Sequence, residues 1–256
     1  MTQTRFLKHN DGTTIAYHST SGKSPGVVFL PGFKSDMTGT KAITAETLCQ
    51  KRGNAFVRFD YQGHGQSSGD FNDGCIGDWA KDTHDVIEQL TSGPQVLIGS
   101  SMGGWIMLLA TLMAPKRICG LLGIAAAPDF TEKLIWNAFS DQQKKDMETT
   151  GYVDIPNCYE GPDYRITKKL IDDGRNHLLL DNDIPITCPV RLIHGQLDED
   201  VPWQTSLETS QKLISEDVEV TLVKSGDHRL SEADDLKRFE NILTRLLDQL
   251  ERSIEA

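Results

Sequence analysis

Hydrophobic and polar positions follow two periods along this chain. Short apolar runs, such as residues 27–30 and 95–98, alternate with longer segments in which apolar residues recur every three or four positions. This alternation predicts an α/β fold, a mainly parallel twisted sheet with helices on both faces. The turn Asn10-Asp11-Gly12 predicts that the first two strands form a hairpin. Strands are predicted at 4–9, 13–18, 27–30, 55–59, 95–98, 120–124, 190–194 and 218–223, and helices at 41–52, 76–90, 103–113, 203–214 and 233–251.

The stretch from 129 to about 189 does not follow this alternation of strand and helix patterns. It is too long for an ordinary connection between a strand and a helix, and only 132–139 and 164–172 have a helical pattern. We therefore expect residues 1–256 to form a single domain with a small helical lid inserted at about 129–189. Large apolar side chains of the insertion either line a pocket or form a small core of their own: Leu134, Trp136, Phe139, Met147, Tyr152 and Tyr159.

One junction between a strand and a helix carries candidate chemistry. The segment Gly99-Ser100-Ser101-Met102-Gly103 follows the predicted strand 95–98 and opens the predicted helix 103–113. Gly-x-Ser-x-Gly in this context is the pattern of a nucleophile elbow, where a sharp turn lifts the serine hydroxyl above the sheet. We predict Ser101 as a nucleophile and the backbone N–H of Met102 as a donor to a developing oxyanion.

A serine hydroxyl needs a base, and the base needs an acid that orients it. Chains with this elbow place them in the order serine, acid, histidine. Asp198 follows the strand 190–194 and His228 follows the strand 218–223, so parallel strands would bring both to the edge that carries Ser101. We predict His228 as the base and Asp198 as the acid. Asp129 and Asp200 remain competing candidates for the acid.

The second oxyanion donor is expected in the loop after an earlier strand. Pro31-Gly32-Phe33 follows the predicted strand 27–30, so we predict the N–H of Phe33 as this donor. A plain β-turn is the alternative for this loop. Two further histidines, His64 and His194, lie in glycine-rich turns, and we interpret them as packing residues.

Together these motifs resemble those of the α/β-hydrolase superfamily, over about residues 4–250. Many members carry His-Gly where this chain has Pro31-Gly32. The resemblance implies an α/β-hydrolase fold and a serine hydrolase with Ser101, Asp198 and His228 as its triad. It rests on the elbow and on Leu30-Pro31-Gly32-Phe33, Asp60-Tyr61-Gln62-Gly63-His64-Gly65-Gln66-Ser67, His194-Gly195-Gln196-Leu197-Asp198 and Gly226-Asp227-His228.

Within the superfamily, residues 99–105 and 226–231 are similar to one branch. It is the branch of the mitochondrial palmitoyl-protein thioesterase and acyl-glucuronide esterase, with its bacterial relatives. This resemblance implies cleavage of carboxylic esters or acyl-thioesters through an acyl-enzyme, with no metal or cofactor. A peptidase or an acyltransferase on the same scaffold, and a non-catalytic ligand receptor, are the alternatives.

Composition restricts the partners and the compartment. A net charge of −11 argues against nucleic acid and anionic membrane surfaces as partners. Five cysteines without a close Cys-x-x-Cys pair are expected to be reduced thiols. Because the first residues carry no apolar leader and no membrane span is visible, we expect a cytoplasmic, bacterial-type enzyme acting on a small-molecule or acylated substrate. The oligomeric state is left open.

Overall fold

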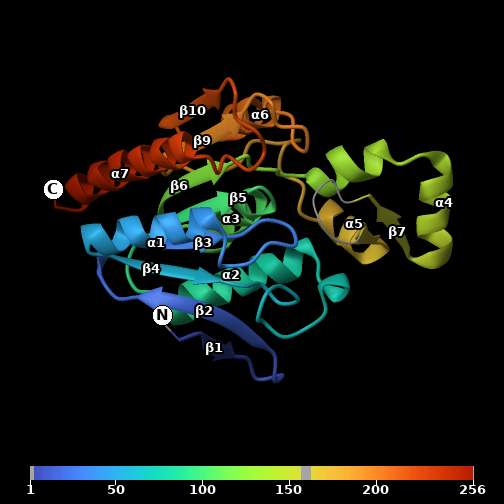
Figure 1. Ribbon diagram of the computed structural model, residues 1–256, viewed down its shortest axis with the longest axis horizontal. Coiled ribbons are helices and arrows are strands. Elements are labelled where there is room, and N and C mark those ends of the chain that lie inside the picture. Colours follow the sequence, from blue (N-terminus) through green and yellow to red (C-terminus); the bar gives the residue numbers. More distant parts are fainter. Residues whose placement is uncertain (1–2, 157–162, 256) are drawn as a thin grey trace.

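A mainly parallel sheet forms the centre of the molecule (Figure 1). The computed structural model describes residues 3–156 and 163–255, and within them the main sheet has eight strands in the order β1-β2-β4-β3-β5-β6-β9-β10. The predicted hairpin β1–β2 is antiparallel, as is the pair β2–β4, and the neighbours from β4 to β10 run parallel. The α/β fold predicted from the sequence is confirmed.

Each predicted strand and helix of the main body is present, with small shifts of its ends. The strands are β1 Arg5–Lys8, β2 Thr14–Thr20, β3 Lys23–Leu30, β4 Asn54–Phe59, β5 Gln95–Ser100, β6 Ile118–Ile124, β9 Val190–Gly195 and β10 Val218–Val223. The helices are α1 Thr40–Arg52, α2 Ile76–Leu90, α3 Met102–Met113, α6 Gln204–Lys212 and α7 Ala233–Glu255, with a short 3₁₀ turn at Phe71–Asp73.

Two apolar layers hold the sheet between its helices. Successive residues of a strand point to opposite faces, so Val28 and Leu97 pack beneath α2 and α3, whereas Phe29 and Ile98 pack beneath α1 and α7. All four side chains are buried. Burial on both faces explains why the central strands read as short, nearly continuous apolar runs in the sequence.

The segment between β6 and β9 leaves the sheet and forms a lobe beside it (Figure 1). Within the described residues, its two strands β7 and β8 pair with each other as a small antiparallel sheet, separate from the main sheet. The elements are a π-helical turn Thr131–Ile135, a 3₁₀ turn Trp136–Ala138, α4 Asp141–Thr150, β7 Tyr152–Ile155, β8 Tyr164–Thr167 and α5 Lys168–Arg175.

This lobe departs from the sequence prediction in two places. The helix predicted at 164–172 begins as strand β8 and becomes helical only after Thr167, whose hydroxyl accepts the N–H of Leu170 at 3.2 Å. Helix α4 was not predicted because it is almost wholly polar. Its start was nevertheless readable, since Ser140 and Gln143 form a reciprocal capping box.

The apolar residues predicted for the insertion divide between a pocket and a small core. Leu134 lines a cavity, whereas Phe139 and Met147 are buried inside the lobe. Trp136 lies under Lys144 and Arg175, whose charged groups are 5.5 Å and 4.5 Å from its ring. Tyr152 is stacked by Arg165 at 3.8 Å. Tyr159 lies outside the described residues.

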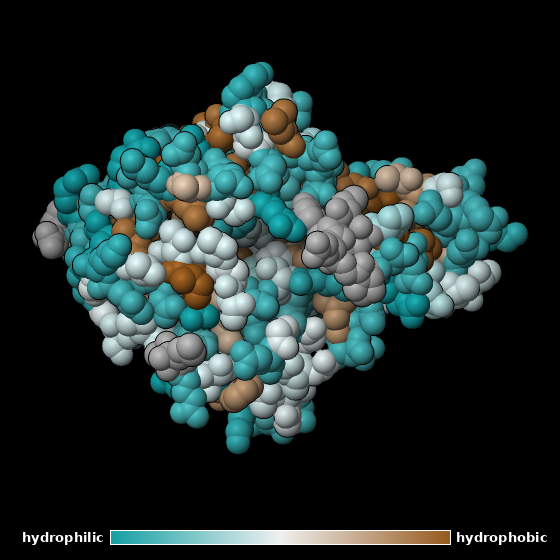
Figure 2. Space-filling model, viewed as in Figure 1, coloured by the Kyte–Doolittle hydropathy of each residue, from teal (hydrophilic) through white to brown (hydrophobic). Residues whose placement is uncertain are grey.

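The surface is mostly polar on the face seen in Figure 2, with scattered hydrophobic residues. Among the described residues, no helix combines the length and the hydropathy that crossing a membrane requires. Cys49, Cys75, Cys119 and Cys188 are free thiols, and Cys158 lies outside the described residues.

Candidate active site

Ser101 occupies the sharp turn between β5 and α3. Its φ of 55° and ψ of −120° lie in a region that residues with a side chain rarely adopt. The backbone is held there by three hydrogen bonds. The N–H of Ser101 donates to the carbonyl of Ile124 at 2.9 Å, and its carbonyl accepts from Gly104 at 2.8 Å and from Ala127 at 3.1 Å. Such strain persists only where the surrounding structure enforces it, which is typical of functional turns.

Glycines make this turn sterically possible. A Cβ at Gly103 would lie 2.2 Å from the carbonyl oxygen of Leu30, and a Cβ at Gly99 would lie 2.3 Å from the carbonyl oxygen of Gly103. Both obstacles are backbone atoms, which cannot move aside as a flexible side chain can. The two glycines of the sequence motif therefore serve close packing of the elbow against β3 and within its own turn.

Replacing Gly103 by alanine is expected to destabilise the protein by about 3 kcal/mol, because the new methyl group must displace the end of β3. Urea unfolding measures this loss. Gly39→Ala is a matched control, since a Cβ there is 3.7 Å from its nearest neighbour and the φ of −58° suits alanine. Because Gly39 is the N-cap of α1, the control is expected to lose at most about 1 kcal/mol, well below the loss at Gly103. Equal stability of the two variants would contradict this account of the elbow.

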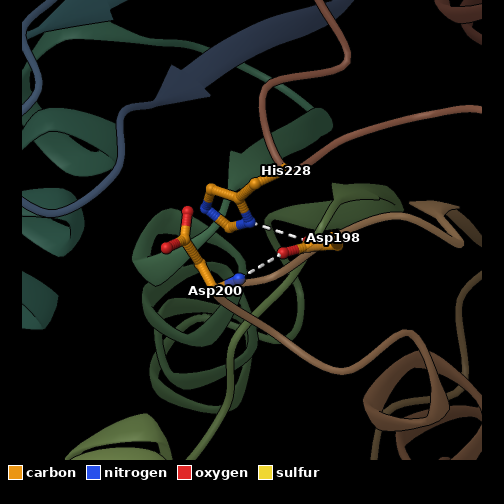
Figure 3. A group of neighbouring side chains, drawn as sticks. All are labelled: Asp198, Asp200 and His228. Carbon is orange, nitrogen blue, oxygen red and sulfur yellow. Dashed lines mark hydrogen bonds and ion pairs between the residues drawn. The ribbon is translucent and has the colours of Figure 1, made fainter. Parts of the chain in front are cut away.

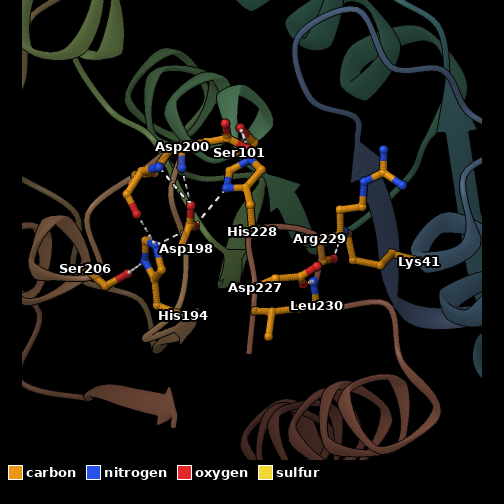
Figure 4. Close-up of polar contacts among 11 residues, drawn as sticks. Lys41, Ser101, His194, Asp198, Asp200, Ser206, Asp227, His228, Arg229 and Leu230 are labelled. Carbon is orange, nitrogen blue, oxygen red and sulfur yellow. Dashed lines mark hydrogen bonds and ion pairs between the residues drawn. The ribbon is translucent and has the colours of Figure 1, made fainter. Parts of the chain in front are cut away.

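Three of the predicted residues meet at the carboxyl edge of the sheet. His228, in the loop after β10, places Nε2 3.0 Å from Ser101 Oγ and Nδ1 2.7 Å from Asp198 Oδ2. Asp198 lies in the loop after β9. Figure 3 shows the His228 ring against the Asp198 carboxylate, and Figure 4 shows the ring between this carboxylate and Ser101. The arrangement is an unbroken hydrogen-bond relay from hydroxyl to imidazole to carboxylate.

The Asp198 carboxylate is buried and saturated with donors. Oδ1 accepts the N–H groups of Asp200 at 2.9 Å and Val201 at 2.8 Å, and Oδ2 lies 3.0 Å from His194 Nε2 in addition to its contact with His228. Burial raises the pKa of this carboxyl, but the hydrogen bonds from the two histidines outweigh it and hold the pKa well below its usual range. Asp198 is therefore ionised at neutral pH.

Asp129, a competing candidate for the acid, binds backbone N–H groups of the insertion instead. Its two carboxylate oxygens accept the N–H groups of Leu179 and Leu180, each at 2.9 Å. The residue has a φ of 59° and is fully buried. Burial raises its pKa, although the two N–H groups oppose that rise. Asp129 thus ties the beginning of the insertion to its end, far along the chain.

Asp200, the other competitor, presents its backbone to Asp198 and its exposed side chain to the cavity (Figure 3). Ligand atoms of Asp198, Asp200 and His228 lie within 4.8 Å of one another, a spacing that would suit a cation. The four acceptor positions of the Asp198 carboxylate are, however, already used by protein donors. A cation at Asp198 would have to displace one of them.

The two residues predicted to supply the oxyanion donors line the same cavity as Ser101. Met102 is the first residue of α3, so its N–H has no acceptor within the helix. The loop after β3 touches the elbow, since a Cβ on Gly32 would lie 3.4 Å from Ser101 Cβ. Phe33 follows, and its ring packs edge-on against several aromatic rings, at 4.8 Å from Phe71 and 5.7 Å from Phe130.

A cavity of about 620 Å³ opens beside Ser101 and His228. Its lining is mixed. The polar lining residues include Lys34, which lies over the Tyr164 ring at 5.0 Å, and Lys41, whose pKa burial lowers to about 8 and whose ammonium donates to the carbonyl of Arg229 (Figure 4). The large apolar lining residues include Phe33, Phe130, Leu134, Ile135, Ile155 and Tyr164.

The two histidines interpreted as packing residues differ in the structure. His64 is enclosed by Tyr61, Phe71 and Trp79, and burial lowers its pKa to about 4, as expected for a packing residue. His194 instead contacts the Asp198 carboxylate, so the interpretation of pure packing is incomplete. The signal in the sequence was its position four residues before Asp198, across a turn.

Known proteins with related sequences and structures fit this architecture. Residues 23–145 match the serine aminopeptidase S33 family. The mitochondrial palmitoyl-protein thioesterase ABHD10 of mouse is 40% identical over 96% of this chain and 82% of its own length. The structure of mouse α/β hydrolase domain-containing protein 10 superposes with a TM-score of 0.91, covering 97% of this chain and 99% of that one. A putative hydrolase from Agrobacterium vitis S4 also gives 0.91, at 34% identity over 96% of this chain and 98% of its own.

The expectation of a cytoplasmic enzyme is wrong by this comparison. The relatives from mouse and human, both 40% identical, are mitochondrial proteins. The expectation had relied on the first few residues, which say little about compartment. Sequence identity across nearly the whole chain, together with the shared fold, shows that this chain belongs to the α/β-hydrolase superfamily, in the family of the ABHD10 palmitoyl-protein thioesterases.

Proposed function

We propose that this protein is a serine hydrolase that cleaves acyl-thioesters, with Ser101 as nucleophile, His228 as general base and Asp198 as the acid that orients it. The observation that carries the proposal is the relay of 3.0 Å and 2.7 Å hydrogen bonds through His228, beside a partly apolar cavity. Relatives named palmitoyl-protein thioesterases support the substrate class.

The relay performs acyl transfer in two steps. His228 Nε2 takes the hydroxyl proton as Ser101 Oγ attacks the acyl carbonyl carbon, and the N–H groups of Phe33 and Met102 hold the resulting oxyanion. One such donor is typically worth about 3–4 kcal/mol. His228 then gives its proton to the departing thiolate, and the acyl group stays on Ser101. In the second step His228 takes a proton from water, whose oxygen attacks the acyl carbon. His228 then returns this proton to Ser101 Oγ as the C–Oγ bond breaks and the acid is released.

Ionised Asp198 keeps the proton of His228 on Nδ1 during this cycle. A proton there leaves Nε2 free to accept from Ser101, and the carboxylate stabilises the imidazolium that forms. The low pKa of Asp198 supports this role, because the carboxylate stays charged throughout the pH range in which His228 acts.

The insertion between β6 and β9 is proposed to act as the lid over the acyl group. Its residues Phe130, Leu134, Ile135, Ile155 and Tyr164 supply large apolar side chains to the cavity beside Ser101. An alkyl chain placed against these side chains leaves water, while the thiol portion of the substrate faces the polar lining residues, which include Lys41. Acyl specificity should therefore depend on this lobe.

Hydrolysis rates across acyl chain lengths test the proposal. Each methylene buried against the apolar lining contributes about 0.8 kcal/mol, so kcat/KM is expected to rise about fourfold per methylene until the lining is filled. The substrates are matched thioesters and oxyesters of saturated acids from acetyl upward. Leu134→Gln, which puts an amide into the lining at similar volume, should flatten the dependence.

Aminoacyl anilides are the control for the peptidase alternative. Faster turnover of these anilides than of every thioester would contradict the proposal, as would a rate independent of acyl length in the parent protein. Turnover of none of these substrates would contradict the enzyme assignment itself.

A further inference from the structure

Two imidazoles share one carboxylate oxygen in this site (Figure 4). His228 Nδ1 lies 2.7 Å and His194 Nε2 lies 3.0 Å from Asp198 Oδ2. His194 is the inner member of the pair, on β9, with a side chain that is completely buried. Its other ring nitrogen, Nδ1, is 2.7 Å from the hydroxyl of Ser206 in α6, which is also buried.

The surroundings of His194 fix where its proton lies. Nε2 faces two acceptors, Asp198 Oδ2 at 3.0 Å and the carbonyl oxygen of Val201 at 3.1 Å. Neither can donate, because the carboxylate is ionised and a carbonyl has no proton. Nε2 therefore carries a proton in either charge state of the ring, and the Ser206 hydroxyl rotates to donate to Nδ1 or to accept from it.

We propose that His194, oriented by Ser206, is a positioning residue for the acid of the relay. Its N–H fixes the rotation of the Asp198 carboxylate so that Oδ2 faces His228, and it withdraws part of the negative charge of that oxygen. This inference rests on the function proposed above and extends it by one residue that does not touch the substrate.

The charge effect has the same sign in both protonation states of His194. A neutral ring donates one hydrogen bond to Oδ2, and a charged ring does so while adding positive charge. Removing the His194 ring, whether neutral or charged, therefore leaves more negative charge on Asp198 Oδ2. This charge stabilises the imidazolium of His228. Since the reaction needs neutral His228, the acid limb of the pH profile of kcat/KM should then move to higher pH.

Other charged groups near His228 stay unchanged in this test. They are Lys34 and Asp36 in the loop after β3, Lys41 at the start of α1, Asp198 and Asp200 in the loop after β9, and Asp227 and Arg229 in the loop of His228 itself. A change in the pH profile is therefore attributable to the substituted pair, His194 and Ser206.

Two substitutions separate positioning from packing. His194→Phe replaces the imidazole by an apolar aromatic ring without nitrogens, and a companion Ser206→Ala change avoids leaving that hydroxyl without a partner. His194→Gln keeps an N–H donor near the position of Nε2. Full-length variants are compared by kcat, KM and the pH profile on one thioester, per active site counted with a fluorophosphonate.

The His194→Phe/Ser206→Ala variant is expected to lose about ten- to a hundredfold in kcat with little change in KM, the range for losing one hydrogen bond to a buried charge. Its acid limb should move up by about one pH unit. His194→Gln should return the limb towards the parent position and recover most of kcat, which a merely space-filling residue would not do.

An unchanged acid limb and kcat per labelled site in the phenylalanine variant would overturn the inference, whatever its thermal stability. No rescue by glutamine despite correct folding would overturn it as well. A parent protein that neither hydrolyses thioesters nor reacts with fluorophosphonate would instead refute the proposed function. The two failures are thus distinguishable in one experiment.

Discussion

Replacing Ser101 by alanine should lower kcat/KM for a thioester by about 10⁴–10⁶-fold, the range seen when a serine nucleophile is removed. The change deletes the oxygen that His228 Nε2 contacts at 3.0 Å, so no acyl-enzyme can form. Residual rate would come from the oxyanion donors and the cavity alone. Steady-state kinetics and fluorophosphonate labelling measure the loss.

The neighbouring Ser100→Ala variant is the matched control for this result. Ser100 is the last residue of β5, one position before the strained turn, and its variant should keep fluorophosphonate labelling. Circular dichroism should give the same melting temperature for Ser101→Ala as for the parent within a few degrees. Labelling that persists in Ser101→Ala and disappears in Ser100→Ala would move the nucleophile to the other serine.

Asp198→Asn should lower kcat by about 10⁴-fold, because the amide forces the wrong tautomer on His228. The carbonyl of the new amide must occupy the place of Oδ1, where the N–H groups of Asp200 and Val201 require an acceptor. Its NH₂ group then faces His228 Nδ1 and donates to it. The remaining proton of His228 moves to Nε2, which can no longer accept from Ser101.

Asp129→Asn is the comparison for this prediction. The oxygen of an amide at position 129 can accept only one of the N–H groups of Leu179 and Leu180. The other N–H then faces the NH₂ group of the amide and has no acceptor, which costs about 1–3 kcal/mol. The variant should therefore melt earlier and keep its activity per labelled active site. A larger loss of kcat in Asp129→Asn than in Asp198→Asn would contradict the assignment of the acid.

The main sheet and the convergence of the site could be predicted because both follow from local patterns. Short apolar runs mark strands that are buried on both faces, and the carboxyl ends of parallel strands share one edge. Ser101, Asp198 and His228 each follow such a strand, and the structure brings them within hydrogen-bond distance. Only the choice among three acids needed coordinates, because loop length alone does not say where a carboxylate points.

The insertion was harder to predict because its order depends on contacts between distant segments. Strand β8 forms by pairing with β7, and the apolar lining of the cavity includes Ile155 and Tyr164 from these strands. Helix α4 has too few apolar residues for a helical period to be visible. The role inferred for His194 was hidden for another reason, since the same residue type in a glycine-rich turn is usually a packing residue, as His64 is.

Trapping the acyl-enzyme tests the central claim most directly. The protein is mixed with a long-chain acyl-thioester, quenched in acid within milliseconds, digested and analysed by mass spectrometry. We predict one acyl group on the peptide that contains Ser101, which decays as free acid appears and is absent from Ser101→Ala. Full turnover with no acylated peptide, or with the acyl group on a different residue, would contradict the account.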